Sequence, residues 1–168
     1  MEQEEYIKKV LPLRNKIFRL ALRLLNNREE AEDLLQDVLM KLWSKKTELE
    51  KYQKLESFVM AISKNLALDR LKKKGRNTID LQEFHSVDKN TSPIQQLELK
   101  NTTNIIHKTI NNLPEQQKTI IQLRDIEEYE FDEIAEITGM NKNLIRVNLS
   151  RARKKIRESL EKLESDEK

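Results

Sequence analysis

Basic side chains gather near the end of this 168-residue chain, in a stretch that holds no acidic residue. Seven of the seventeen residues from Asn141 to Arg157 are cationic, namely Lys142, Arg146, Arg151, Arg153, Lys154, Lys155 and Arg157. An ordinary solvated helix face mixes Glu with Lys so that neighbours pair, and that alternative fits this stretch poorly. Because uncompensated cations attract phosphate groups, the stretch predicts a surface that binds nucleic acid.

The apolar residues of the same stretch recur at steps of three and four, which predicts an α-helix capped by Asn141. They are Ile145, Leu149, Ala152 and Ile156. At about 100° per residue, a polar flank runs beside this apolar stripe. The flank consists of Arg146, Ser150, Arg153 and Arg157, and Asn143, Val147 and Lys154 continue the outward surface.

The first turns of this predicted helix hold the best candidates for contact with DNA bases. Side chains there enter the major groove, where Asn143 and Arg146 can each make two hydrogen bonds to one base. Val147 can pack against a thymine methyl group. We expect the more distant cations to bind phosphates instead, and these are Arg151, Arg153 and Arg157.

A shorter helix is expected just before this one, around Phe131 to Thr138, with Gly139 between the two. Ala135 is small enough for two helices to approach closely and Gly139 suits a tight turn, so the pair has a helix-turn-helix pattern. A helical hairpin in a plain bundle is the alternative, and the charge favours DNA binding. The earlier helix and the residues before it are acidic, so one face of this unit would attract phosphate and another would repel it.

A second basic cluster closes another predicted helix, at Lys64, Arg70, Lys72, Lys73, Lys74 and Arg76. Asn65 lies within the cluster, and its amide can donate and accept at a base edge. A lysine-rich loop that includes Tyr52 and Lys54 flanks it. Cations do stabilise the negative end of a helix, but six exceed what one helix dipole requires. We therefore expect the protein to touch DNA at two places.

An acidic stripe lies opposite the apolar side of the predicted helix that follows Asn27. It consists of Asp33, Gln36, Asp37 and Met40, which share about 100° of arc. A methionine centred among carboxylates suggests a protein-docking surface. Single exposed apolar residues are also common on ordinary surfaces, so both interpretations stay open at this point.

Composition excludes several classes of protein. The chain has no cysteine, which removes disulfides and thiolate chemistry and favours the cytosol. His85 and His107 are far apart without partner spacing, and two glycines cannot build a phosphate loop, so we expect no enzyme, metal or cofactor. The acidic start does not resemble a signal peptide, and no apolar run approaches the length of a membrane span.

Apolar periodicity predicts helices throughout the chain, and the first covers residues 6–26. The second runs to Ser44 and begins at the Asn27 cap, with Glu30 as the reciprocal partner of that cap. A third runs over about 57–74 and ends at Gly75, where a glycine can adopt the left-handed conformation. The strongest start signal is at Ser92-Pro93-Ile94-Gln95, and another helix begins at Pro114. We thus expect an all-α chain with two small domains, residues 1–75 and 92–168, joined by a flexible linker at 76–91.

Five segments of the chain resemble small bacterial sigma factors of the extracytoplasmic-function group. The first is AEDLLQDV at 31–38, with Leu42 and Trp43 after it, and the second is ISKNLALD at 62–69. The others are LPEQQ at 113–117, EIAE at 133–136 and RARKK at 151–155. Their order and their two-domain spacing match that family across nearly the whole chain.

The resemblance implies a protein that binds core RNA polymerase and directs it to a set of promoters. Asp33, Gln36, Asp37 and Met40 would then dock on the polymerase, and Lys64, Asn65 and the basic residues that follow would recognise and open the minus-ten element. The helix after Asn141 would bind the minus-thirty-five element. The resemblance also implies an anti-sigma factor as a partner, with the protein itself cytoplasmic and not inserted in a membrane.

This chain departs from the family pattern at several positions. Phe58 stands where tryptophan is usual, and Glu130 stands where a Ser or Thr cap is typical, which predicts a weaker helix start before Phe131. Leu144, Val147 and Asn148 replace the more polar or basic residues that are common in this helix of the family, so the promoter sequence stays open. A free-standing helix-turn-helix regulator is the alternative function, although no heptad seam for the dimer that it requires is evident.

Overall fold

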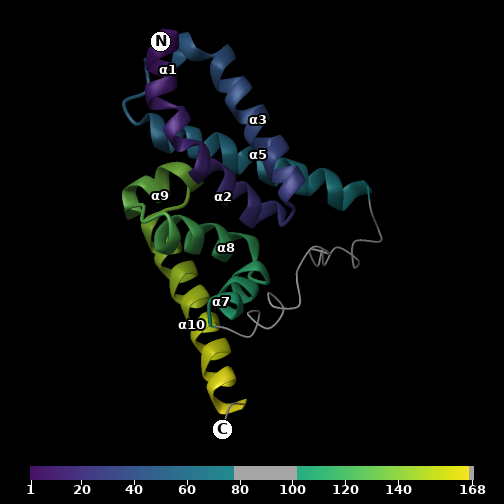
Figure 1. The fold of residues 1–168 in the computed structure, drawn as a ribbon. Coiled ribbons are helices and arrows are strands. Elements are labelled where there is room, and N and C mark those ends of the chain that lie inside the picture. Colours follow the sequence, from purple (N-terminus) through teal and green to yellow (C-terminus); the bar gives the residue numbers. More distant parts are fainter. Residues whose placement is uncertain (78–101, 167–168) are drawn as a thin grey trace.

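The structure, a computed structural model, describes residues 1–77 and 102–166. Every regular element within those two ranges is a helix, which confirms the predicted all-α fold. Figure 1 shows one group of helices built from the first range and a second group built from the other. In the described part of the chain, no helix is both long and apolar enough to cross a membrane.

The predicted first helix is in fact broken into three pieces. These are α1 (Gln3–Lys9), a 3₁₀ turn η1 (Leu11–Leu13) and α2 (Arg14–Leu25). Pro12 lies in the short turn, because proline has no N–H for an α-helical hydrogen bond and its ring clashes with the preceding turn. The single helix expected over 6–26 is therefore wrong at this point, although its apolar residues Ile17, Leu20 and Leu24 are buried as expected.

The second predicted helix is confirmed as α3 (Arg28–Ser44). Its cap forms as the sequence predicts, since the backbone N–H of Glu30 donates to the side-chain oxygen of Asn27 at 3.0 Å. The carboxylate of Glu30 does not return the bond to Asn27 but contacts Lys74 instead. Asn26, in the left-handed conformation, ends α2, so α2 and α3 meet at a tight turn and pack together.

A short helix α4 (Lys46–Leu49) lies in the lysine-rich loop, and α5 (Leu55–Asn77) follows it. The prediction that Gly75 would end this helix is wrong, because α5 continues through Gly75 to residue 77. Among the glycines, positive φ is found at Gly139 and not at Gly75, so Gly75 is an ordinary helical residue here. The end of α5 projects away from the other helices (Figure 1).

The second group of helices begins with α7 (Thr102–Asn111) and α8 (Glu115–Ile121). A π-helical turn η3 (Gln122–Ile126) follows, then α9 (Phe131–Thr138) and the long α10 (Lys142–Asp166). Its core is formed by Ile110, Leu113, Ile120, Ile121, Leu123, Ile134, Ile137, Ile145, Leu149 and Ala152. The predicted cap at Ser92 and most of the predicted linker lie outside the described residues.

The two groups of helices pack directly against each other. Helix α9 lies along α5, and α2 contacts both α8 and η3. This packing joins distant parts of the chain. Arg19 and Glu127, for example, are 108 residues apart in the sequence and are hydrogen-bonded to each other. For brevity we call residues 1–77 the first unit and residues 102–166 the second unit.

Candidate nucleic-acid interface

The turn between α9 and α10 has the geometry of a helix-turn-helix. Gly139 adopts φ 75°, the left-handed conformation that lets the chain reverse after α9. The backbone N–H of Leu144 donates to the side-chain oxygen of Asn141 at 2.8 Å, so the predicted cap of α10 forms. No side-chain cap is present at Glu130 before α9, as its residue type predicts.

The candidate base-contacting residues Asn143, Arg146 and Val147 are exposed on one side of α10, together with Ser150 of the polar flank. Arg146 does not extend freely into solvent. Its guanidinium lies 5.6 Å from the centre of the Phe131 ring and donates to Asn143 at 3.3 Å. These contacts hold the guanidinium beside the start of α10, where base edges would be met.

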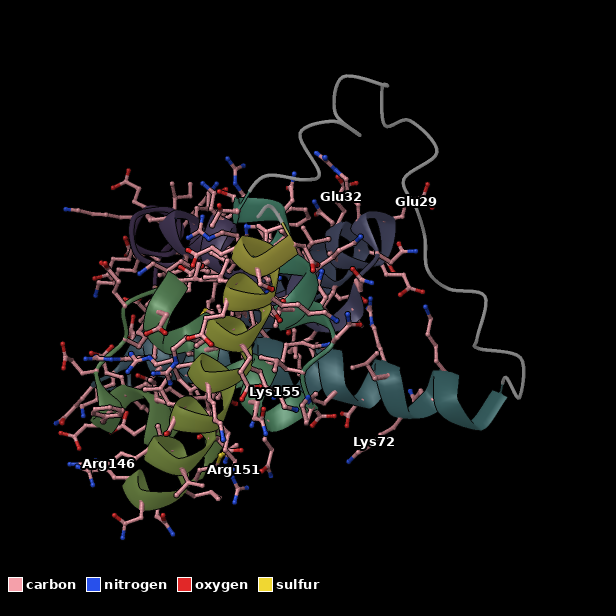
Figure 2. All side chains as sticks on the ribbon, turned by 90° about the horizontal axis from the view of Figure 1, so that it is seen from below. Glu29, Glu32, Lys72, Arg146, Arg151 and Lys155 are labelled. Atoms are coloured by element: carbon pink, nitrogen blue, oxygen red, sulfur yellow. The ribbon has the colours of Figure 1, made fainter. Side chains whose placement is uncertain are left out.

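The other cations of α10 fall into two groups. Arg153 makes a two-point ion pair with Asp125, at 2.6 and 3.0 Å, which raises the pKa of the guanidinium, and Lys142 contacts Asp132. Arg151, Lys154, Lys155 and Arg157 are exposed and have no ion pair within the described ranges. In Figure 2, the labelled side chains of Arg146, Arg151 and Lys155 come from α10, and that of Lys72 comes from α5.

The basic cluster of α5 is divided in the same way. Asn65, Lys72 and Lys73 are exposed, while Lys64 is half-buried and its burial lowers the pKa of the ammonium group. Arg70 and Lys74 turn toward α3 instead. Arg70 contacts Asp37 and approaches Asp33 at 3.5 Å, and Lys74 contacts Glu30. The residues predicted for DNA on α5 thus share a surface with those predicted for polymerase on α3.

The acidic stripe of α3 is exposed at all four predicted positions. Asp33, Gln36 and Asp37 are exposed, and Met40 has 68% of its surface in contact with solvent. Trp43, one turn further along, is also exposed, and the ammonium group of Lys46 lies 3.9 Å from the centre of its ring. The stripe therefore extends into an apolar patch that an exposed helix face does not require for folding.

A pocket of about 330 Å³ lies beside the lysine-rich loop. Tyr52 and Phe58 stack with ring centres 3.8 Å apart at this pocket. Its other lining residues are Gln53, Lys54, Ser57, Ala61 and Glu136. Aromatic faces next to a lysine can stack and hold an unpaired base, because every base has a π-face and a nearby phosphate. In the sequence, the aromatic Tyr52 near the basic Lys54 is the signal that points to such a pocket.

The described residues contain no group of three or more His, Asp or Glu side chains that could hold a metal ion. His107 hydrogen-bonds with Arg23 of the first unit at 2.9 Å and lines an open pocket. Partial burial and the neighbouring Arg23 charge lower its pKa from the ordinary value of 6.5. This histidine therefore takes part in contacts between the two units.

Two protein families match this chain. Residues 10–77 match Sigma-70 region 2, and residues 103–156 match Sigma-70, region 4. RNA polymerase sigma factor SigV of Bacillus subtilis is 31% identical over 146 residues, covering 86% of this chain and 84% of the relative. The ECF RNA polymerase sigma factor SigW of the same organism is 27% identical over 163 residues, covering 89% and 86%.

A solved structure has a similar fold. It is the sigma factor RpoE in complex with the anti-sigma factor NepR from Bartonella quintana, with a TM-score of 0.74 and 24% identity. The similarity covers 94% of this chain and 98% of that one. The helix arrangement of the described residues is thus one that an experimental structure also contains.

Proposed function

The chain belongs to the extracytoplasmic-function sigma factors of RNA polymerase, and on that premise we propose which of its surfaces bind promoter DNA and which bind polymerase. A sigma factor binds core RNA polymerase and directs it to start transcription at particular promoters. The family membership favours this function over that of a free-standing helix-turn-helix regulator. The further assignments are made from the exposed faces of α3, α5 and α10.

Helix α10 binds the minus-thirty-five element in this proposal. The observation that supports it best is the exposed, acid-free face of α10 directly after a helix-turn-helix turn. Asn143, Arg146, Val147 and Ser150 would meet base edges near the start of the helix. The phosphate contacts would come from Lys142, Arg151, Arg153, Lys154 and Arg157, of which Lys142 and Arg153 must first leave their carboxylate partners.

The minus-ten element would bind along α5 and the loop before it. The residues of α5 that would contact the DNA are Lys64, Asn65, Lys72 and Lys73. The pocket at Tyr52 and Phe58 has the size and the aromatic wall to hold one base that has left the base stack of the DNA. Extracting a base costs a few kcal/mol, and stacking on an aromatic ring offsets part of that cost. Arg70 and Lys74 would join the contact after release from α3.

Core polymerase would dock on α3, at the surface formed by Asp33, Gln36, Asp37 and Met40. Its charge suits a basic partner, and its exposed methionine suits an apolar contact at the centre. Arg70 partly neutralises the two aspartates in the free protein, so a basic partner would compete with Arg70 for them. Docking would then release a cation beside the minus-ten surface.

The role is that of a transcription factor that performs no reaction itself, and it places the protein in the cytoplasm with the polymerase. We include an anti-sigma factor among the partners, because a sigma factor of similar fold is known in complex with one. Such an inhibitor would act by covering the polymerase-binding or DNA-binding faces.

Reconstitution tests the proposal directly. The protein is mixed with core RNA polymerase and a genomic promoter library, and protected fragments are sequenced with and without core. We expect selective protection of two elements centred near positions −35 and −10 when core is present. Equally tight and selective binding without core would contradict the sigma-factor assignment and favour a free-standing regulator.

A further inference from the structure

We propose that the free protein inhibits itself: the acidic turn and helix from Glu127 to Thr138 cover the pocket end of the minus-ten surface, at Lys54 and Lys64, until the two units separate. The proposal rests on the assignment of that surface in the proposed function. It adds an internal occupant of the surface, the second unit of the same chain. Four sets of contacts support it, each joining residues that are far apart in sequence.

The first contact is a two-point ion pair between a buried carboxylate and a half-exposed arginine. The guanidinium of Arg19 on α2 donates to both carboxylate oxygens of Glu127, at 2.5 and 2.8 Å. Only 2% of the Glu127 side chain is exposed, and this hydrogen bond raises the pKa of Arg19. Burying a carboxylate is costly unless a partner compensates its charge, and here the partner belongs to the other unit. The contact therefore favours the closed arrangement.

The backbone around Glu127 is shaped to reach the first unit. The π-helical turn η3 precedes it, and Glu128 adopts φ 62°, a left-handed conformation that is strained for a residue other than glycine. Glu127 and Tyr129, on either side of Glu128, are both buried. The Tyr129 hydroxyl donates to Glu56 on α5 at 2.8 Å, and burial raises the pKa of Tyr129, so the hydroxyl keeps its proton. The strained backbone at Glu128 therefore places the side chains on both sides of it in contact with the first unit.

Helix α9 forms one side of the candidate base pocket. Glu136 lines the pocket, and its carboxylate accepts a hydrogen bond from Lys54 at 2.8 Å. That contact raises the pKa of Lys54, as a phosphate at the same place would. The ammonium group of Lys64 also lies 3.5 Å from the Thr138 carbonyl. Carboxylate and carbonyl oxygens thus occupy positions that DNA oxygens would take.

A second row of contacts secures the other side of the interface. Arg23 on α2 donates to Gln122 and Asn111, each at 2.8 Å, and also contacts His107. Its burial lowers the pKa of the guanidinium. Because Arg23 contacts both η3 and α7, two separate elements of the second unit are bound to the first unit.

The closed arrangement is incompatible with binding both promoter elements. Elements centred at −35 and −10 are separated by about 25 base pairs, or roughly 85 Å at 3.4 Å per base pair. Helix α10 has 25 residues and is therefore only about 37 Å long. Helix α9 contacts the pocket, and only three residues separate α9 from α10, so the start of α10 lies close to the pocket. The units must separate before both surfaces can be used.

A charge-swap cycle on the free, full-length protein tests the proposal. Dyes on Glu4→Cys and Glu161→Cys report the distance between units, and the absence of native cysteine makes the labelling specific. Arg19→Glu and Glu127→Arg should each lower energy transfer, and the double variant should restore it. Binding to a short fluorescein-labelled single-stranded DNA should tighten about fivefold or more in each single variant and return toward the original value in the double variant.

Arg19→Glu is the decisive variant, because a more acidic protein should otherwise bind DNA more weakly. Arg14→Glu on the same helix and Glu130→Arg before α9 are controls that carry the same charge changes at exposed positions, where the described residues form no hydrogen bond or ion pair between the units. Unchanged energy transfer in both single variants, or opening without tighter DNA binding, would overturn the proposal. Failure of the wild-type protein to bind core polymerase would instead contradict the proposed function, so the two failures are distinguishable.

Discussion

Arg146 is the side chain on which promoter selectivity should depend most. It is exposed near the start of α10, yet its guanidinium is oriented by the Phe131 ring and by Asn143. An arginine held in this way loses less conformational freedom when it makes two hydrogen bonds to a base. The structure therefore adds a physical reason for its role that helical spacing alone did not provide.

Arg146→Ala should reduce discrimination between promoters that differ in the upstream element by about 1 to 3 kcal/mol. The measurement is competition binding of reconstituted holoenzyme to promoter fragments with single base changes. Arg157→Ala is the matched control, since loss of a phosphate contact should weaken binding to all fragments alike and reduce its salt dependence. Unaltered discrimination by the Arg146 variant would reject the base contact.

At the scale of elements, α3 and α10 each combine a buried apolar face with an exposed functional face. In α3 the buried residues Leu34, Val38 and Leu42 fix the helix in the first unit, and this packing leaves Asp33, Asp37 and Met40 in solvent. The packing of α5 against α3 then brings Arg70 to the two aspartates. The docking surface is thus a joint property of two helices.

Asp33→Arg combined with Asp37→Arg should abolish core polymerase binding, because the new charges repel a basic partner. Circular dichroism should show an unchanged helical content, since both side chains lie in solvent. Glu29→Arg with Glu32→Arg is the control with an equal charge change on the same helix (Figure 2). Holoenzyme assembly by the Asp33 and Asp37 variant, measured by size-exclusion chromatography, would rule out this docking surface.

The cap of α10 gives a second prediction at this scale. Asn141→Ala removes the acceptor for the Leu144 N–H and should lower the free energy of unfolding by about 1 kcal/mol. Urea denaturation followed by circular dichroism measures the change. Asn141→Ser, which keeps an acceptor oxygen, should lose little stability. An equal loss in both variants would mean that the hydrogen bond is not the cause.

In the whole molecule, stability should depend on pH through the contact between His107 and Arg23. The pKa of His107 is lowered in the folded protein, so folding favours the neutral ring. Its contribution is therefore present above the unfolded pKa of about 6.5 and is lost as the pH falls through the folded pKa. Acidification should weaken the interface between the units.

We expect the free energy of unfolding to fall between about pH 7.5 and pH 5.5 in the wild-type protein and to fall less in His107→Gln. Glutamine keeps an acceptor for Arg23 but does not gain a proton. Urea denaturation at a series of pH values provides the comparison. Identical pH profiles for the two proteins would show that His107 does not contribute to the pH dependence.

Much of the fold and the site could be predicted because helix periodicity, caps and charge runs are local properties of a sequence. Asn27 and Asn141 cap their helices as expected, and the cations of α10 stand on its outer side. The errors are local as well, since the helix predicted over 6–26 breaks at Pro12 and the helix predicted to end at Gly75 continues through it. Proline breaks a helix through its own backbone, whereas glycine ends one only if the next residues prefer another conformation.

The sequence alone determined most of the helices, which side of each is apolar and where charge accumulates, because these depend on neighbours within a few residues. Only the tertiary structure decided the partners of those charges. Glu127 and Glu136, predicted simply to repel DNA, contact Arg19 and Lys54 of the other unit. Such pairs arise from the packing of whole helices onto one another, and no short-range pattern in the chain specifies which distant cation a carboxylate will meet.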